Sequence, residues 1–413
     1  MAAPPVPAPP VLAPRDFADL TEIVAAAAAE GHVLEVAGGG SKRGWGRPVE
    51  ADARLDLRSL AGITLYEPEE LVLSAGAGTP MVEIARRLAA AGQELAFEPG
   101  DWGPLFGSPA ETGTIGGIVA SNLAGPRRVK SGAARDHFLG LRAVGGRGEA
   151  FKAGSRVMKN VTGYDLPKLL AGSFGTLAVL AEVTVKVLPA AESVRTLLLL
   201  GLDDVRAGEA MRRALATPYD VSGAAHLPAA VAARSGVALV SGTGQSVTAI
   251  RMEGPRPSAI HRLDALRKDL ADLGAASEEL HSANSRTFWR EITDLRPFAD
   301  DPARPLWRLS VAPSEGPAVV ERLRGHLAFD HAYDWGGGLI WIALAAGADP
   351  AADRVRGAFR QGHATLVRGT EEARARVPVF QPQEGALAAL AVRVKESFDP
   401  KRILNRGRMY ASM

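Results

Sequence analysis

Three glycine-rich turns contain the residues whose types and spacing could do chemistry. The first is AGGGSKRGWG, from Ala37 to Gly46, and it follows the short apolar run VLEVA. Because glycine has no Cβ, backbone N–H groups in such a turn can approach an anion closely. Taken alone, this turn is as compatible with a plain structural role as with phosphate binding.

The two most common phosphate-binding motifs do not fit the first turn. A Walker loop needs GxxxxGK[ST], but Ser41-Lys42 follows the glycines with the wrong spacing and order. A dinucleotide-binding Rossmann turn needs GxGxxG at the start of a helix. Gly44, Gly46 and Pro48 cannot begin a regular helix. If the first turn holds an anion, it therefore uses loop amides without a helix behind them.

The second and third turns strengthen the case for a phosphate ligand. TGTIGGIVASN, residues 112–122, offers amides near Gly116 and Gly117 and hydroxyls on Thr114 and Ser121, and a helix N-terminus is expected there. The third turn lies in KNVTGYDLPKLLAGSFGTLAVL, residues 159–180. Three such turns within 175 residues exceed what folding alone requires.

Regular elements must position these turns. In the first half we expect helices at 19–31 and 81–92, strands at 33–37, 70–76, 136–144 and 177–189, and a functional Gly/Pro-rich loop at 98–122. In the second half the patterns predict strands at 194–202, 305–313 and 337–346, and helices at 204–217, 261–274, 316–327 and 349–362. The second half therefore reads as helices on one face of an antiparallel sheet, with a boundary near Pro189.

Composition excludes several classes of protein. The 413 residues are 46% hydrophobic and 23% charged, with 48 basic against 46 acidic side chains, so no nucleic-acid partner is expected. No apolar run approaches the ~20 residues of a membrane span. Cysteine is absent, which excludes disulfides, a thiolate nucleophile and cysteine-bound metal clusters. The Pro/Ala-rich residues 1–14 read as a disordered lead-in rather than a signal peptide, so a cytoplasmic location is the default expectation.

In this order, the three turns resemble the vanillyl-alcohol-oxidase-type (PCMH-type) FAD-binding domain over residues 15–190. TGYDLPKLLAGSFGTL, residues 162–177, resembles the branch that contains D-lactate dehydrogenases and glycolate oxidase. The closing FDPKRILNRGRMY, residues 398–410, resembles the C-terminal segment with which this family returns to its flavin domain.

The resemblance implies an α+β fold. It consists of a PCMH-type domain of two α/β subdomains at 15–190, an α+β (ferredoxin-like) cap domain at 191–385 and a closing segment at 386–413. Relatives with covalent FAD attach it through a histidine beside the first turn or through a cysteine. Ser41 stands beside this turn and the chain has no cysteine, so we expect non-covalent FAD.

The resemblance also implies which residues contact the cofactor. In this family the first turn wraps the FAD pyrophosphate, the second lines the pyrophosphate and ribityl region, and further residues lie nearby. Carried onto this chain, the set is Ala37, Gly38, Gly39, Gly40, Ser41, Pro99, Gly113, Thr114, Ile115, Gly116, Gly117, Ser121, Asn122, Arg135, Asp136, Gly163, Tyr164, Asp165, Gly175, Thr176 and Val183.

The catalytic residues cannot be assigned from the sequence, and no metal is expected. Relatives that oxidise hydroxy acids carry a histidine-rich segment, which this chain lacks. His326 and His331 have no standard ligand spacing, and we expect one at an exposed helix end and one in a loop. His137 and His226 are expected to be structural, with a position near the flavin as the alternative for His137. Arg286 and Arg290 lie in a helical pattern that more often faces water, although a guanidinium would suit a substrate carboxylate. 

The implied function is that of an FAD-binding subunit in a glycolate (2-hydroxy-acid) oxidase complex. A second, catalytic FAD subunit and an iron–sulfur subunit are the expected partners, with a small 2-hydroxy acid as substrate. Such a subunit would be cytoplasmic and would reach the inner face of the membrane only through its complex. Two alternatives stay open: a free-standing FAD-dependent dehydrogenase of another hydroxy acid or alcohol, and an FAD-stabilised accessory subunit without its own catalysis.

Overall fold

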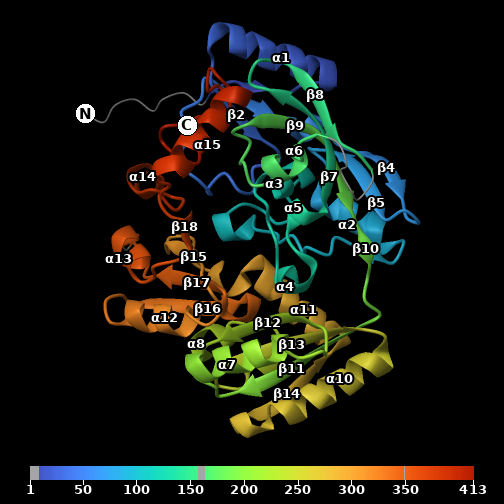
Figure 1. Ribbon diagram of the computed structural model, residues 1–413, viewed down its shortest axis with the longest axis vertical. Coiled ribbons are helices and arrows are strands. Elements are labelled where there is room, and N and C mark those ends of the chain that lie inside the picture. Colours follow the sequence, from blue (N-terminus) through green and yellow to red (C-terminus); the bar gives the residue numbers. More distant parts are fainter. Residues whose placement is uncertain (1–8, 157–162, 348) are drawn as a thin grey trace.

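Two halves of the chain pack against each other in the computed structural model, which describes residues 9–156, 163–347 and 349–413 (Figure 1). The N-terminal half contains a five-stranded sheet with strand order β4-β5-β9-β7-β8 and a three-stranded sheet with order β1-β3-β2. The other half is built on an eight-stranded sheet with order β14-β11-β13-β12-β16-β17-β15-β18. This mixed architecture confirms the predicted α+β class.

The N-terminal half contains ten short strands and six helices in the described residues. The strands are β1 Val11–Leu12, β2 Leu34–Ala37, β3 Ala53–Asp56, β4 Ile63–Glu67, β5 Val72–Gly76, β6 Gln93–Glu94, β7 Phe138–Gly145, β8 Ala150–Gly154, β9 Ala178–Lys186 and β10 Leu188–Pro189. The helices are α1 Phe17–Glu30, α2 Met81–Ala89, α3 Ile115–Ala120, α4 Arg128–Ser131, α5 Ala134–His137 and α6 Leu166–Leu170.

Local capping explains where these elements begin and end. Helix α1 starts after Asp16, whose carboxylate accepts the N–H of Asp19, and it ends at Gly31, which has a φ of 77°. The strand predicted from residue 136 starts only at Phe138. Asp136 lies in α5 instead, because its carboxylate accepts the N–H of Ala133 and winds the chain into a turn.

In the second half every neighbouring strand pair is antiparallel. The strands are β11 Ser193–Leu200, β12 Val221–Leu227, β13 Val247–Gly254, β14 Ala276–His281, β15 Leu306–Ser310, β16 Phe329–Asp334, β17 Leu339–Leu344 and β18 His363–Arg368. The helices are α7 Asp204–Leu215, α8 Ala229–Ala232, α9 Ala238–Ser241, α10 Arg256–Asp269, α11 Ser282–Asp294, α12 Gly316–Arg324, α13 Ala352–Gly357, α14 Glu371–Arg376 and α15 Gly385–Phe398.

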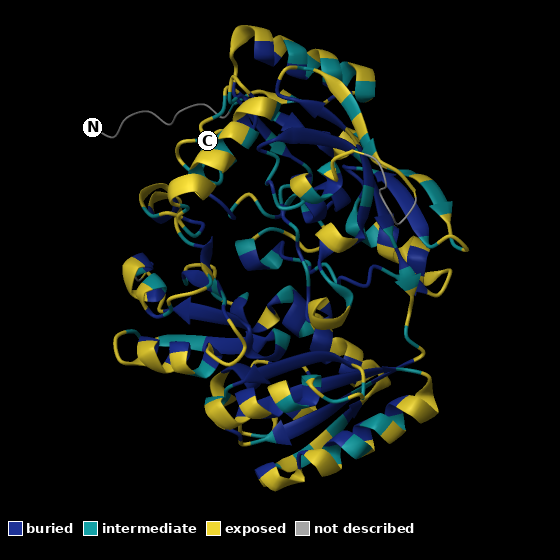
Figure 2. Ribbon diagram, viewed as in Figure 1, coloured by how far each residue is buried: buried dark blue, intermediate teal, exposed yellow. Residues whose placement is uncertain are grey.

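The eight-stranded sheet is buried on both faces (Figure 2). Helices α7, α10, α12 and α13 cover the outer face and form two apolar clusters with it. On the inner face, strand residues such as Trp341 and Leu306 share one core cluster with Phe97 and Trp102 of the N-terminal half. Helices α8 and α11 also contribute to that cluster. The inner face therefore joins the two halves.

Two helices differ most from the sequence prediction. Helix α10 starts at Arg256 rather than at residue 261, because Pro255 and Pro257 open it, and proline suits the first turn of a helix. Helix α13 is confined to Ala352–Gly357, much shorter than the predicted 349–362.

The C-terminal end of the chain returns to the first turn region. After α15, Leu34 of β2 donates its N–H to the carbonyl of Ile403 (2.7 Å) and accepts the N–H of Asn405 (3.0 Å). Figure 1 shows α15 beside β2, at the opposite end of the molecule from α10. None of the described helices is both long and apolar enough to cross a membrane.

Candidate functional site

The first glycine turn leaves a run of backbone donors without acceptors. None of the N–H groups of residues 38–42 donates to an acceptor in the described part of the chain. The loop carbonyls are used instead: Gly40 accepts the N–H of Arg43, and Lys42 accepts that of Trp45. Consecutive free amides of this kind form a concave site for an anion.

The glycines of this turn are required by close packing against the second turn. A Cβ on Gly38 would lie 2.3 Å from Thr114 Oγ1, and one on Gly39 would lie 1.8 Å from the carbonyl oxygen of Thr112. Gly40 has a φ of 76°, a conformation that other residues rarely adopt. The two turns therefore meet as bare backbone.

Helix α3 begins in the second turn, and its amides are largely satisfied. Thr114 caps the helix by accepting the N–H of Gly117. The expectation of a free amide at Gly116 is wrong, because this N–H donates to the carbonyl of Ala77 (2.9 Å). Gly116 is instead needed for packing, since a Cβ there would lie 2.7 Å from that of Ala77. The Ser121 hydroxyl donates to the carbonyl of Gly117 (2.7 Å).

These two turns enclose a cavity of about 100 Å³, here called the loop pocket. Its charged lining consists of Glu35, Lys42, Arg43 and Arg408. The other lining residues are Val36, Ala37, Gly38, Gly39, Gly40, Ser41, Thr114, Gly117, Ala120, Ser121, Phe174 and Asn405. Of the residues expected at the cofactor, Ala37 to Ser41, Thr114, Gly117 and Ser121 are thus brought together here.

Eight residues of the loop pocket were missed by sequence reasoning: Glu35, Val36, Lys42, Arg43, Ala120, Phe174, Asn405 and Arg408. Two of them come from the closing segment, which the sequence had already marked as returning to this region. Asn405 accepts the N–H of Val36 (2.8 Å) and donates its amide to the carbonyl of Phe174 (2.7 Å). Arg408 donates to the carbonyls of Lys42 (3.2 Å) and Arg43 (3.0 Å).

Other expected cofactor residues lie outside the loop pocket. Gly175 is adjacent to it, because a Cβ there would approach Asn405 Nδ2 to 2.8 Å. Asp136 and Asp165 cap short helices, and Tyr164 is 92% exposed. Gly163 is exposed in a bend. The remaining members make local contacts or are buried in helix or strand: Ile115, Gly116, Asn122, Arg135, Thr176 and Val183. 

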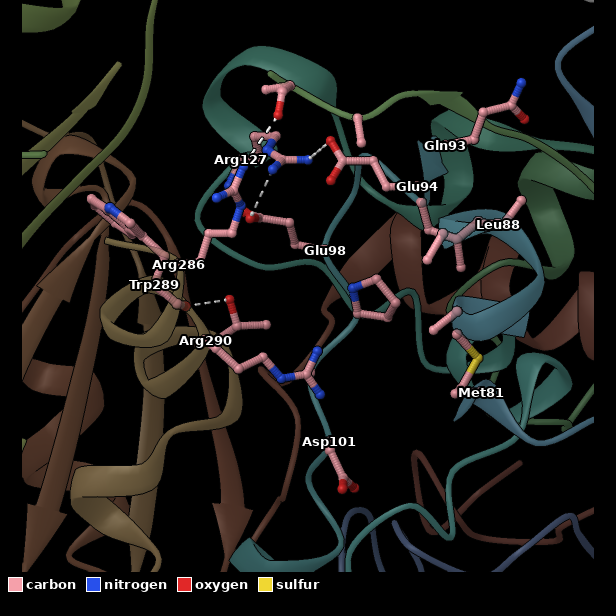
Figure 3. Close-up of a pocket in the computed structure, with 18 of the residues that line it drawn as sticks. Met81, Leu88, Gln93, Glu94, Glu98, Asp101, Arg127, Arg286, Trp289 and Arg290 are labelled. Carbon is pink, nitrogen blue, oxygen red and sulfur yellow. Dashed lines mark hydrogen bonds and ion pairs between the residues drawn. The ribbon is translucent and has the colours of Figure 1, made fainter. Parts of the chain in front are cut away.

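A larger cavity of about 570 Å³ lies between α2 and α11 and is here called the α2–α11 pocket. Figure 3 shows Arg286, Trp289 and Arg290 of α11 on one wall and Met81 and Leu88 of α2 on the other. Pro99 and Gly113, two of the expected cofactor residues, also line it. A Cβ on Gly113 would lie 3.8 Å from Ser41 Oγ, so the second turn separates the two pockets by a single backbone segment.

A network of buried ion pairs forms the floor of the α2–α11 pocket. Arg251 of β13 binds both carboxylate oxygens of Glu98 (2.7 and 2.9 Å) and stacks over Trp289 (4.5 Å). Arg127 pairs with Glu94 and with Glu253. Burial raises the pKa of Glu94. Burial would do the same to Glu253, but Arg251 and Arg127 hold the pKa of that carboxyl below its usual value. 

The two arginines of α11 differ in their partners. Arg290 pairs with Asp294 (2.7 Å), whose other carboxylate oxygen accepts the N–H of Asp101 (2.7 Å). Arg286 donates only to the carbonyls of Ala191 and Glu192, at 3.3 and 3.4 Å. Both arginines line the α2–α11 pocket. Of the four arginines that line this pocket, Arg286 is the one without a carboxylate partner in the described residues.

Comparison with known proteins places this geometry in a family. An "FAD binding domain" model matches residues 8–154. The chain is 34% identical to "Glycolate oxidase subunit GlcE" of Escherichia coli (strain K12) over 381 residues, 92% of this chain and 93% of that protein. The chain belongs to the GlcE family. This assignment confirms the expected resemblance and FAD as the cofactor.

More distant similarities cover other flavoproteins. "Glycolate oxidase subunit GlcD" of Bacillus subtilis (strain 168) is 29% identical over 191 residues, 46% of this chain and 39% of that one. Among solved structures, 4-ethylphenol oxidase from Gulosibacter chungangensis superposes with a TM-score of 0.73 and 14% identity, covering 97% of this chain and 88% of that one. The latter likeness shows the fold alone.

The loop pocket of this GlcE-family chain fits the diphosphate of FAD. Five free amides, a cavity bounded by glycines that admit no Cβ, and the cationic group of Lys42 are the kind of donor set that a doubly charged anion requires. When bound, FAD would supply the group that accepts two electrons from a substrate.

Histidines of this GlcE-family chain line neither pocket. His137 lies in α5 with Nε2 bonded to the carbonyl of Ser131 (2.8 Å). The expectation of a loop position is wrong for His331, which is buried on β16. Its Nε2 lies 3.1 Å from both carboxylate oxygens of Asp204. His226 faces the same carboxylate at 3.6 Å. Burial alone would raise the pKa of Asp204, but the two histidines hold it well below its usual value.

Proposed function

We propose that this chain is the FAD-binding subunit of a 2-hydroxy-acid oxidase complex that oxidises glycolate to glyoxylate. The carrying observation is the similarity to a glycolate oxidase subunit along nearly the whole length of both chains. In this proposal a catalytic FAD subunit and an iron–sulfur subunit complete the enzyme. The chain itself is cytoplasmic and reaches the inner face of the membrane through these partners.

The division of the chain and the mode of FAD attachment belong to the same proposal. Residues 15–190 form the FAD domain, 191–385 the cap and 386–413 the closing segment, with 1–14 as a tail. FAD is held without a covalent bond, because Ser41 stands beside the turn and the chain has no cysteine. Acid precipitation should therefore release all flavin into the supernatant, and flavin left in the pellet would contradict this part.

In this proposal the substrate occupies the α2–α11 pocket. Its volume of about 570 Å³ lies in the usual range for small-molecule sites, and Gly113 and Pro99 connect it to the cofactor region. Arg286 is the candidate partner for the substrate carboxylate, since a guanidinium binds a carboxylate through two parallel hydrogen bonds. We assign no catalytic base.

Substitution of Arg286 tests the substrate position. In the assembled complex, Arg286→Gln should raise the KM for glycolate about tenfold with little change in kcat, because it removes a binding contact to a charged group. Arg256→Gln on the exposed start of α10 serves as a control and should leave KM unchanged. An unchanged KM in R286Q would exclude this arginine as the carboxylate partner.

Two alternatives have support of their own. The α2–α11 pocket lies within this chain, which favours a free-standing dehydrogenase. An accessory subunit is favoured by the aromatic packing beside the first turn. The ring centroid of Trp45 lies 5.0 Å from those of Trp102 and Phe174, so aromatic side chains fill the space between the first turn and the eight-stranded sheet. 

Anaerobic mixing of the FAD-loaded chain with glycolate or D-lactate separates the three functions. Rapid bleaching of the flavin in the isolated chain, at the rate of full turnover, favours a free-standing enzyme. Bleaching only after co-expressed partners are added supports the proposed complex. No bleaching of this flavin in a complex that turns glycolate over identifies an accessory subunit.

A further inference from the structure

The loop pocket contains a cation without a counter-charge. The Lys42 side chain crosses the pocket from the first turn toward α3, where its Nζ would lie 3.8 Å from a Cβ on Gly117. Its hydrogen-bond partner is the hydroxyl of Ser41 at 3.2 Å. No carboxylate among the described residues lies within 4.0 Å of this ammonium group. Lys42 is thus a half-buried charge whose hydrogen-bond partner is neutral.

The other two cations of the pocket are already engaged. Arg43 binds both carboxylate oxygens of Glu35, at 2.8 and 2.6 Å. Arg408 donates to the two loop carbonyls and lies 4.0 Å from Glu35. Lys42 is therefore the cation of this pocket whose charge is available to a ligand.

Burial of this unpaired ammonium is unfavourable in the protein without ligand. Burial lowers the pKa of Lys42 to about 8, and the more distant Asp101 offsets this only in part. Residues 38–42 line the same cavity, and their five N–H groups have no acceptor in the described part of the chain. A half-buried charge without a counter-charge and a set of amides without acceptors call for one anion that satisfies them together.

We propose that Lys42 is the counter-ion of the FAD diphosphate and decides the preference of the loop pocket for phosphorylated flavins. The amides of residues 38–42 would donate to the phosphate oxygens from one side, and the ammonium would close over them from the side of α3. This inference rests on FAD as the cofactor of the family. It does not depend on the substrate or on the partners, so it can fail while the proposed function holds.

Flavin titration of the full chain, stripped of its cofactor, tests this role. Lys42→Met keeps the length of the side chain and removes its charge. We expect K42M to bind FAD about tenfold or more weakly, the usual loss for a hydrogen bond to a charged group, and to bind riboflavin, which has no phosphate, as the wild type does. Lys42→Arg should restore most of the affinity for FAD.

Three further measurements make the result decisive. Lys152 is an exposed lysine on β8, and Lys152→Met is the matched control that should bind both flavins normally.

The affinity of the wild type for FAD should fall with added salt and above pH about 8, and K42M should lose most of both dependences. Circular dichroism and the melting temperature without flavin check folding, and K42M should melt no lower than the wild type because it removes a buried charge.

The proposal is overturned if K42M binds FAD with unchanged affinity, or if it loses FAD and riboflavin equally. The first result would mean that the amides alone bind the diphosphate. The second would mean that Lys42 maintains the shape of the loop and that its charge does not contribute to binding.

Discussion

Buried charges in this chain are mostly paired, and the exceptions carry chemical meaning. Lys42 is one exception in the loop pocket. Asp334 is another: it ends β16 on the inner face of the eight-stranded sheet, is 3% exposed, and accepts the N–H of Trp335 (2.7 Å). Burial raises the pKa of Asp334 to about 7, although Arg251 and Arg308 act against this effect and Glu98 adds to it.

Asp334 should make the protein less stable as the pH rises toward neutrality. The folded carboxyl has a pKa near 7 and the unfolded one near 3.8, so between these values the folded state binds more protons. Stability from this group is therefore present below pH 4 and is lost as the pH rises to about 7. Compared with D334N, the wild type should lose about 2 kcal/mol between pH 5.5 and 8.

Thermal unfolding of both proteins at the two pH values measures this difference. Asparagine keeps the acceptor for the N–H of Trp335 and cannot ionise, so the comparison isolates the titration. Equal shifts in melting temperature for the wild type and D334N would contradict the prediction.

At the scale of elements, the closing segment braces the first glycine turn. Asn405 accepts the N–H of Val36 in β2, and Arg408 donates to the carbonyls of Lys42 and Arg43. The N–H groups on the opposite side of the loop therefore stay free. The segment is itself anchored by Lys395, which donates to Asp399 (2.7 Å) and to the carbonyl of Leu404 (3.0 Å). The amides of the cofactor site are thus oriented by residues at the other end of the chain.

Arg408→Gln should loosen the turn without removing any contact to the ligand. We expect about tenfold weaker FAD binding, because a flexible loop must be ordered when the ligand binds. We also expect faster tryptic cleavage after Arg43. The neighbouring Arg406→Gln removes an exposed side chain that donates only within its own turn and should change neither measurement. Wild-type cleavage rates in R408Q would disprove the bracing role.

At the scale of the whole molecule, two halves are joined by a mixed interface. Apolar residues such as Trp102 and Trp341 pack across it, with ring centroids 5.7 Å apart. Beside them, Glu98 of the N-terminal half pairs with Arg251 of the eight-stranded sheet, and Arg127 links Glu94 to Glu253. The α2–α11 pocket lies over this ionic network, so the junction of the two halves forms the pocket.

Breaking the Glu98–Arg251 pair should destabilise this junction. Arg251→Met leaves the Glu98 carboxylate buried with a poorer set of partners and should cost about 3–5 kcal/mol, as for other buried pairs that lose one member. The double variant E98M/R251M should recover part of this loss, because no uncompensated charge remains. Melting temperatures of the two single variants and the double variant give the coupling.

The exposed pair of Arg213 and Asp272 provides the matched control, and Arg213→Met should change stability little. Strict additivity of the Glu98 and Arg251 substitutions would show that the pair does not couple the two halves.

Much of the local structure could be predicted because its causes are local. Asp16 and Gly31 mark the ends of α1, and the Leu-rich run 196–202 forms most of a buried strand. The close approach of backbone segments at the glycine turns could also be predicted, since only residues without a Cβ fit there. Prediction failed where a distant partner intervened: Ala77 occupies the amide of Gly116, and Asp204 draws His331 into the core of the cap.

The sequence by itself determined where the backbone can approach an anion, where helices start and stop, and that no thiol chemistry occurs. These properties follow from single residues and their immediate neighbours. Tertiary structure alone decided which amides remain free, which cation lacks a counter-charge and which charges meet beneath the α2–α11 pocket. Burial and pairing depend on segments far apart in the chain, as in the bond between Val36 and Asn405 across 369 residues.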